Sequence, residues 1–191
     1  MEVSTKDKPG KKSKAQMKLY DHFFEPFISE QKISNRVREL ASEIKKDYAG
    51  SSPVMIGVLN GAFIFASDLV RAFHEPCECC FVKVSTYNGM KSSGSFALDL
   101  DLKTNIEGKD IIIIEDIIDS GFTLKCFLEY LKDRKPASVS IATLLFKPDA
   151  LKHELPIKYV GFEIPNKFVI GYGLDYNEQG RQLKDIWVVK S

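Results

Sequence analysis

The chain contains 191 residues, of which 44% are hydrophobic and 28% charged, and its 27 Lys and Arg exceed its 26 Asp and Glu by one. This composition is ordinary for a soluble globular protein, and the length suits one sizeable core with a lid. Residues 1–15 hold five Lys and two acids, so the rest of the chain carries a net charge of −2. A mildly acidic body excludes a nucleic-acid platform, which needs a dense positive face.

Apolar stretches and cysteines indicate a cytoplasmic protein. The longest apolar runs, such as residues 54–59, fall far short of the roughly 20 residues that a membrane helix needs, and the polar N-terminus lacks a signal-peptide core. Three of the four Cys stand in residues 77–80, too close together for a disulfide framework, and the three His are isolated from one another. We therefore expect unpaired thiols in a reducing compartment and no membrane association.

The N-terminal part predicts a tail followed by a helix. Residues 1–15 are polar and rich in Lys, so we expect a disordered basic tail. Apolar residues recur at helical spacing over residues 33–44, with Ser34 or Asn35 able to cap the start. Gly50 follows the end of this pattern. The stretch is typical of an amphipathic helix.

From residue 54 onward, strands and helices alternate. Apolar and β-branched runs predict buried strands, and stretches with helical periodicity predict the helices between them. In chain order these are the strand 54–59, the helix 62–73 after the Asn60-Gly61 turn, the strand 111–114, the helix 123–134, and the strands 139–146, 159–162, 169–171 and 187–189. The alternation predicts an α/β fold with a central, mostly parallel sheet flanked by helices, in which ligands bind beyond the carboxyl ends of the strands.

A polar segment interrupts this alternation. Residues 88–95 are rich in Gly and Ser, and residues 96–102 behind them alternate between apolar and polar. Long polar insertions in compact domains are usually functional loops. We expect a flap or hairpin with a mobile loop over about residues 84–110.

The segment from Ile111 to Thr123 carries the strongest chemical signal. Four consecutive Ile predict a buried strand, and Glu115 and Asp116 follow at its carboxyl end. Asp119 comes three residues later, in a turn of small and hydroxyl residues that opens a helix. Helix N-termini attract phosphate and carboxylates bind sugar hydroxyls, so the pattern predicts a sugar-phosphate site. The simpler interpretation, solvated acids with one helix cap, suits one acid better than three.

Residues 111–123 resemble the phosphoribosyl-pyrophosphate signature of the type I phosphoribosyltransferase family, and the form EDIIDSG resembles its hypoxanthine-guanine branch. The similarity runs from about residue 33 to Val189. It includes VLNGAF (Val58–Phe63), VSTYNG (Val84–Gly89), LLFK (Leu144–Lys147) and GFEIPNKFVIGYGLDYNEQGR (Gly161–Arg181). The resemblance implies the type I fold with a small hood and a flexible flap, in one domain over residues 16–191.

The resemblance also implies an activity: a Mg²⁺-dependent transfer of the 5-phosphoribosyl group from phosphoribosyl pyrophosphate to hypoxanthine or guanine. The products are IMP or GMP and pyrophosphate, in purine salvage. Asp119 is implied as the general base at nitrogen 7 of the purine. Further implied roles are Glu115 and Asp116 for the ribose hydroxyls, Ser120, Gly121, Phe122 and Thr123 for the 5′-phosphate, Leu59, Asn60, Gly61 and Arg181 for pyrophosphate, Lys147, Phe168, Val169 and Asp175 for the purine, Asp175 with Glu115 and Asp116 for Mg²⁺, and Thr86 and Tyr87 for the flap loop.

Other functions stay open at this point. A nucleotide-sensing regulator with the same fold would tolerate loss of Asp119 or Lys147, and both are present. A xanthine-preferring enzyme is a second alternative, because discrimination at the purine 2-position depends on backbone geometry. Asn60 replaces a Lys of many relatives, which predicts weaker pyrophosphate binding. The expected partners are phosphoribosyl pyrophosphate, a purine base and further copies of the chain in a homodimer or homotetramer, with neither nucleic acid nor a membrane.

Overall fold

The computed structural model describes residues 15–87 and 95–190. Two sequence-based predictions fall outside this part of the chain: the basic tail, as far as residue 14, and the centre of the flap, residues 88–94. Within the described residues, no helix is long and apolar enough to cross a membrane.

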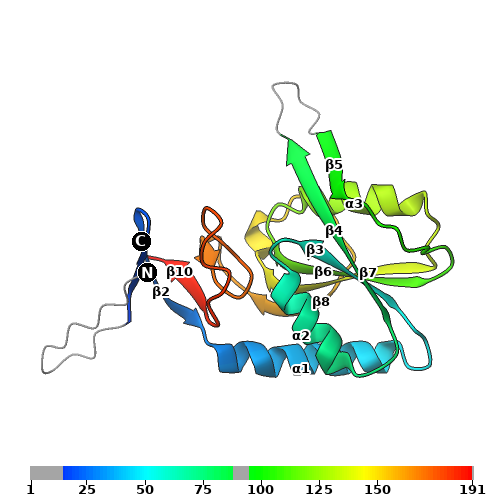
Figure 1. Ribbon diagram of the computed structural model, residues 1–191, viewed down its shortest axis with the longest axis horizontal. Helices are drawn as coiled ribbons and strands as arrows, with labels where there is room; N and C mark the ends of the chain where they lie inside the picture. Colours follow the sequence, from blue (N-terminus) through cyan, green and yellow to red (C-terminus); the bar gives the residue numbers. More distant parts are fainter. Residues whose placement is uncertain (1–14, 88–94, 191) are drawn as a thin grey trace, which may run out of the picture. The chain divides into compact units, whose positions relative to one another are not determined.

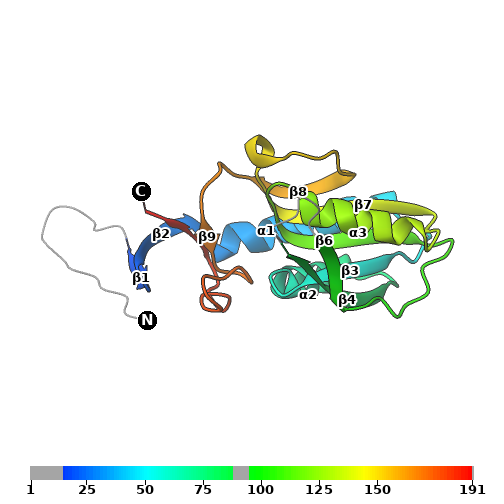
Figure 2. The same ribbon diagram turned by 90° about the horizontal axis from the view of Figure 1, so that it is seen from above.

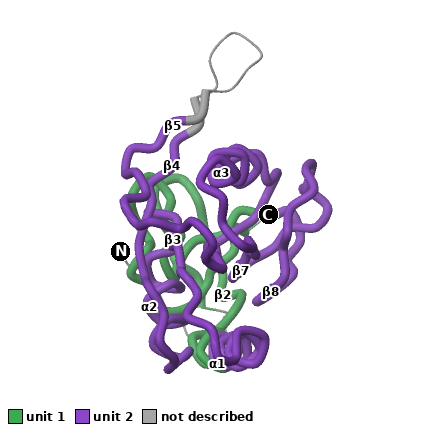
Figure 3. The backbone as a smooth tube through the Cα atoms, turned by 90° about the vertical axis from the view of Figure 1, so that its right-hand side faces the viewer, with its two compact units in different colours: residues 1–35, 167–191 green, residues 36–166 purple. Residues whose placement is uncertain are grey.

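The chain forms two compact units, which are described separately (Figure 3). Unit 1 combines the two ends of the chain, residues 1–35 and 167–191, and unit 2 consists of residues 36–166. The single domain expected over residues 16–191 stays a prediction.

Unit 2 is built on a six-stranded sheet within the described residues. Its strands are β3 (Val54–Leu59), β4 (Glu78–Tyr87), β5 (Ser95–Leu100), β6 (Asp110–Ile118), β7 (Ser138–Phe146) and β8 (Ile157–Glu163). Their order is β5-β4-β3-β6-β7-β8, and all neighbours are parallel except β5, which pairs antiparallel with β4. Figure 2 shows this order from β8 to β4, and Figure 1 shows β4 and β5 extending beyond the other strands.

Helices cover both faces of this sheet. They are α1 (Glu30–Asp47), which begins in unit 1 and continues in unit 2, α2 (Phe63–Phe73) and α3 (Phe122–Lys132). Figure 3 shows α3 on one side of the strands and α1 and α2 on the other. Burial on both faces explains the apolar run Ile111–Ile114, whose side chains are all inaccessible to solvent. The mostly parallel sheet flanked by helices is therefore confirmed.

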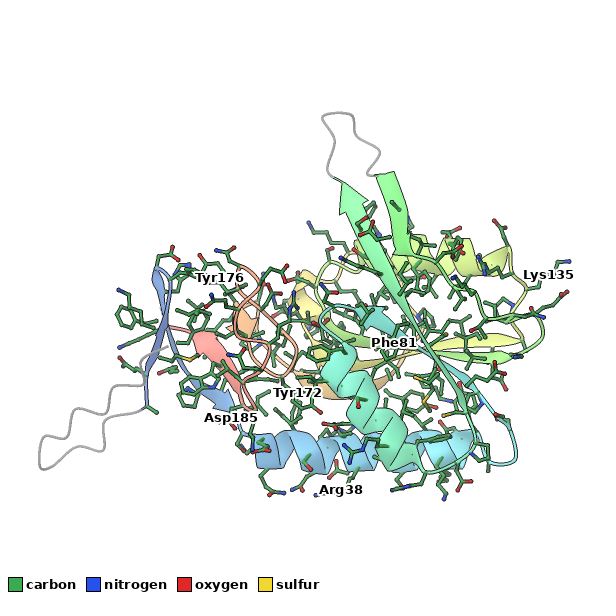
Figure 4. All side chains as sticks on the ribbon, in the orientation of Figure 1. Arg38, Phe81, Lys135, Tyr172, Tyr176 and Asp185 are labelled. Atoms are coloured by element: carbon green, nitrogen blue, oxygen red, sulfur yellow. The ribbon has the colours of Figure 1, made fainter. Side chains whose placement is uncertain are left out.

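One close approach on the α2 side requires a glycine. A Cβ atom on Gly57 of β3 would lie 2.7 Å from the ring of Phe81 and 3.2 Å from the Cβ of Ala66 in α2. Figure 4 labels Phe81 on β4. Because Gly57 has no side chain, the Phe81 ring fits against β3 beside α2.

Several element boundaries differ from the sequence prediction, and two of the larger differences have a clear structural reason. Helix α1 begins at Glu30 rather than near residue 33, because the backbone N–H of Ile33 already donates to the carbonyl of Ser29 at 3.0 Å. The predicted caps Ser34 and Asn35 therefore lie inside the helix. Strand β6 continues to Ile118, because β7 pairs with it to that residue.

Unit 1 contains a small second sheet. Its strands are β1 (Met17–Leu19), β2 (His22–Ile28), β9 (Val169–Ile170) and β10 (Ile186–Val189), arranged antiparallel in the order β1-β2-β10-β9 within the described residues. Met17, Leu19, Phe24 and Ile170 form its core. The sequence analysis did not predict β1 and β2, because only every second or third residue of this segment is buried.

Candidate active site

The segment with the strongest chemical signal lines a cavity of about 290 Å³ in unit 2. The cavity lies at the carboxyl ends of β3 and β6 and at the start of α3, where ligands bind in open parallel sheets. It brings together most of the residues predicted for phosphoribosyl pyrophosphate. Its lining is Val58, Leu59, Gly61, Val84, Glu115, Asp116, Ile117, Ile118, Asp119, Ser120, Gly121, Phe122, Thr123 and Leu124.

Glu115 and Asp116 lie within the last four residues of strand β6 and not in the loop after it. Asp116 is only 8% exposed, and its Oδ1 accepts a hydrogen bond from the backbone N–H of Ile117 at 2.8 Å. Burial, and next the like charge of Asp116, raise the pKa of Glu115 well above its ordinary value. The pair therefore favours one protonated and one ionised carboxyl group.

The turn after β3 lies against Asp116. A Cβ atom on Gly61 would overlap the Asp116 carboxylate and would lie 2.5 Å from its Cγ. No L-residue with a side chain fits here without moving that carboxylate. The turn begins with the Leu59–Asn60 peptide bond, which is cis. Gly61 is therefore a place where backbone and acid approach closely.

The turn of residues 119–121 leads into α3, which begins at Phe122. Gly121 has φ +77°, which favours glycine, and a Cβ there would meet the side chains of Leu151 and Leu155. The backbone N–H of Lys152 donates to the carbonyl of Ser120 at 3.1 Å. The turn is thus supported by the segment after β7, and the first N–H groups of α3 have no partner within the helix. Such an end attracts an anion.

Asp119 and Lys147 form an ion pair. Nζ of Lys147 donates to Oδ2 of Asp119 at 2.7 Å, although the two residues lie 28 positions apart. Lys147 is only 7% exposed, whereas the Asp119 side chain is about half exposed. The predicted general base and the predicted purine donor are therefore neighbours. The sequence analysis assigned both residues but not this contact, because it crosses from β6 to the end of β7.

The remaining purine and metal candidates belong to unit 1. Phe168 is 42% exposed, and Val169, the first residue of β9, is buried. Asp175 and Arg181 form an ion pair, with Oδ1 and Nη2 separated by 2.8 Å. Oδ2 of Asp175 also accepts the backbone N–H of Glu178 at 2.8 Å.

Thr86 and Tyr87 end β4, where their backbones pair with Phe96 and Ser95 of β5. Asn60 belongs to the turn after β3. Five apolar lining residues were not predicted, because nothing distinguishes them from ordinary core residues: Val58, Val84, Ile117, Ile118 and Leu124. Only the fold brings Val84 of β4 beside the acids, whereas Ile117 follows Asp116 directly in the sequence. No sequence signal marks them.

Other cavities and cysteines give a weaker basis for chemistry. A larger cavity of about 590 Å³ lies between α3 and the segment after β7, and its lining combines several Lys with Pro, Leu and Val. It lacks the strand-end acids. The thiols of Cys77, Cys79 and Cys80 are free, and burial raises the pKa of each, which makes them weak nucleophiles. Among residues 15–87 and 95–190, no group of three His, Cys, Asp or Glu forms a metal cage.

The parallel sheet, the acids at the strand end and the turn before α3 define a phosphoribosyl transferase. The family described as "Phosphoribosyl transferase domain" matches residues 28–177. The chain is 48% identical to the hypoxanthine-guanine phosphoribosyltransferase of Dictyostelium discoideum over 164 residues, 83% of this chain and 91% of that protein. It is 46% identical to the Bacillus subtilis (strain 168) enzyme of the same name, over 85% and 91% of the two chains.

A solved structure agrees with these relatives. The hypoxanthine-guanine phosphoribosyltransferase of Bacillus anthracis, which holds HEPES in its active site, aligns with a TM-score of 0.83 at 40% identity. The alignment covers 87% of this chain and 98% of that one. The chain belongs to the hypoxanthine-guanine phosphoribosyltransferase family.

Proposed function

We propose that this protein transfers the 5-phosphoribosyl group from phosphoribosyl pyrophosphate to hypoxanthine or guanine, giving IMP or GMP and pyrophosphate. The observation that carries the proposal is the cavity of unit 2, where Glu115 and Asp116 adjoin a phosphate-type helix start. The family membership supports the same reaction. We expect xanthine and adenine to be poor substrates.

The acids of β6 match the electrostatics of the transfer. Cleavage of the anomeric bond builds positive charge on the ribose, as it does in glycoside hydrolysis. We assign Glu115 and Asp116 to the ribose hydroxyls, where an ionised Asp116 also faces that developing charge. Neither acid needs to act as a nucleophile.

Other groups of the protein are assigned to bind the 5′-phosphate and the pyrophosphate. We assign the 5′-phosphate to the turn Ser120–Thr123, because the first N–H groups of α3 lack partners within the helix and a helix N-terminus attracts anions. The turn Leu59-Asn60-Gly61 and the guanidinium of Arg181 are assigned to pyrophosphate. Asn60 brings no positive charge to this turn, which predicts modest pyrophosphate affinity.

Asp119 and Lys147 suit the base-directed half of the reaction. The purine loses a proton as it attacks, and a well-placed carboxylate at nitrogen 7 accelerates such a step by about 10²–10⁴-fold. We assign this role to Asp119. Lys147, which donates to Asp119 in the free protein, is assigned to the 6-oxo oxygen. Phe168 is assigned to stacking, and Val169 and Asp175 to polar contacts with the base. Thr86 and Tyr87 belong to the loop that we expect to exclude water.

The acids present fit a magnesium ion that arrives with the substrate. Mg²⁺ prefers oxygen ligands, keeps several waters and is usually bound by one or two carboxylates together with substrate phosphates. Asp175 offers such a carboxylate in unit 1, and Glu115 and Asp116 offer theirs in unit 2. When bound, the ion neutralises charge on the leaving pyrophosphate.

Three further proposals concern the setting of the enzyme. We propose that it works in the cytoplasm, that it forms a homodimer or homotetramer, and that residues 16–191 act as one domain with a flap over about residues 84–110. Light scattering on the purified protein tests the assembly, since a monomer at micromolar concentration contradicts it.

A steady-state assay tests the activity. Phosphoribosyl pyrophosphate and Mg²⁺ are supplied with hypoxanthine, guanine, xanthine and adenine in turn, and nucleotide formation is followed. We expect product from hypoxanthine and guanine that disappears on chelation. Rapid xanthine turnover with slow turnover of both others would replace the substrate assignment. Nucleotide binding without product from any base would support the regulator instead.

A further inference from the structure

Two tight turns of unit 1 have an unusual composition. Tyr20 and Asp21 connect β1 to β2, and Asn177 and Glu178 connect the bridged residues Tyr176 and Gln179. The φ angles of Tyr20, Asn177 and Glu178 are +52°, +47° and +63°. Two-residue turns with positive φ favour Asn and Gly, so a Tyr at such a position is costly. A Tyr in this conformation points to a contact that compensates the strain.

Two tyrosine hydroxyl groups link the two turns by hydrogen bonds. Tyr20 donates its hydroxyl to the carbonyl of Asn177 at 3.3 Å, and Tyr176 donates its hydroxyl to Oδ1 of Asp21 at 2.7 Å. The two tyrosine rings meet edge to face, with centroids 5.6 Å apart and planes at 84°. We call Tyr20, Asp21, Tyr176 and Asn177 the tyrosine clasp. Figure 4 labels Tyr176 on the loop between β9 and β10.

The Asp21 contact is the stronger of the two polar links. It joins a phenol to a carboxylate, and charge-assisted hydrogen bonds are about twice as strong as neutral ones. The same bond, as the largest cause, lowers the pKa of Asp21 and raises that of Tyr176. The carboxylate therefore stays ionised and the phenol protonated at neutral pH.

The ring of Tyr176, which the clasp restrains, is in contact with the ring of Phe168. The Phe168 ring packs against the edge of Tyr176, with centroids 5.5 Å apart and planes at 77°, and against the buried Phe24 at 6.2 Å. Phe24 is fixed by the core of unit 1. Tyr176 packs against the same core and is also held by the clasp through its hydroxyl group. An exposed ring that must present one face to a ligand needs support of this kind.

We propose that Asp21 and Tyr176 are positioning residues that set the orientation of the Phe168 ring and thereby the affinity for the purine base. The proposal rests on the stacking role of Phe168 in the proposed function. Asp21 and Tyr20 precede residue 28, where the family match begins, so the clasp joins an N-terminal turn of this chain to the matched domain.

The test compares two Tyr→Phe variants that each lose one hydroxyl group. Tyr176→Phe keeps the ring and removes its bond to Asp21, whereas Tyr48→Phe removes a 2.9 Å contact with Ser140 in unit 2. For each variant, KM for guanine, KM for phosphoribosyl pyrophosphate, kcat and the melting temperature are measured. Asp21→Ala and Asp21→Asn extend the series, since Asn retains a neutral acceptor.

Tyr176→Phe and Asp21→Ala are expected to raise KM for guanine about three- to tenfold, the range expected when the misoriented Phe168 ring no longer stacks well on the base. KM for phosphoribosyl pyrophosphate should change less than about twofold. Asp21→Asn should recover part of the loss. Tyr48→Phe should lower the melting temperature and leave both KM values unchanged.

Two results overturn the inference in distinguishable ways. An active wild type whose guanine KM is unaffected in Tyr176→Phe and Asp21→Ala removes the positioning role and leaves the proposed function intact. Equal increases in both KM values, tracking the melting temperature, assign the clasp to stability alone. A wild-type protein without transfer activity overturns the proposed function, and the positioning role with it.

Discussion

Replacing Gly61 by alanine tests whether the Asp116 carboxylate takes part in binding the ribose. The new Cβ would lie 2.5 Å from Cγ of Asp116, whereas folded proteins essentially never place a Cβ closer than 3.0 Å to a neighbour. The carboxyl carbon must therefore move by at least about 0.5 Å, and the overlapping Oδ2 by more. Asp116 is almost fully buried, so the shift distorts β6 or the turn itself.

The expected kinetic effect follows from that displacement. A misplacement of about 1 Å in an active site lowers the rate by about 100-fold, so kcat/KM for phosphoribosyl pyrophosphate should fall by about 10- to 100-fold. Overpacking should also cost about 1–3 kcal/mol of stability. The assay is steady-state kinetics with saturating guanine, alongside thermal unfolding.

Gly57→Ala is the matched control. Its Cβ would lie 2.7 Å from the Phe81 ring in the core, so it should destabilise β3, the strand that leads into the Gly61 turn, without touching the acids. We expect a similar loss of stability with nearly normal kinetics. If Gly61→Ala retains normal kcat/KM, or if both variants lose activity equally, the argument that Gly61 positions Asp116 for the substrate is refuted.

Three further predictions concern the acids and the metal. Asp119→Asn should lower kcat at least 100-fold with little change in KM for phosphoribosyl pyrophosphate; an unchanged kcat removes the proton-transfer role. Because burial and the charge of Asp116 raise the folded pKa of Glu115 well above its ordinary value, ionising this group costs the folded state stability as pH rises above about 4.5. Glu115→Gln should therefore have a higher melting temperature than the wild type at neutral pH, by a difference that shrinks as pH falls toward about 4.5. Chelation of Mg²⁺ should abolish turnover without changing the melting temperature by more than about 1 °C.

The buried strands were predictable because their signal is local. Four consecutive Ile place apolar side chains on both faces of a strand, so both faces must be buried. The structure places Ile111–Ile114 in β6, in the middle of the sheet. The turn that leads into α3 was predictable for a similar reason, since Gly121 and the hydroxyl residues around it are contiguous, whereas its role in binding phosphate stays a prediction. Residue roles beyond these patterns rest on the family resemblance and stay predictions.

Contacts between distant segments were not predictable. The Lys147–Asp119 ion pair, the close approach of Gly61 to Asp116 and the tyrosine clasp each join residues that only the fold brings together. The start of α1 was missed for a smaller reason: Ser29 and Glu30 begin the helix, but the apolar periodicity begins only at Ile33. Periodicity reports the buried face of a helix and not its first turn.

The cavity of unit 2 gathers three acids where we propose that an anion binds, and two features of the structure reduce this conflict. Burial and the charge of Asp116 favour a protonated Glu115, and Lys147 pairs with Asp119 at 2.7 Å. We propose that the phosphate binds at the N-terminus of α3 and not at the acids. The remaining carboxylate charge is most useful when positive charge develops on the ribose, that is, in the transition state. The arrangement therefore favours the transition state over the bound substrate, which is the condition for catalysis.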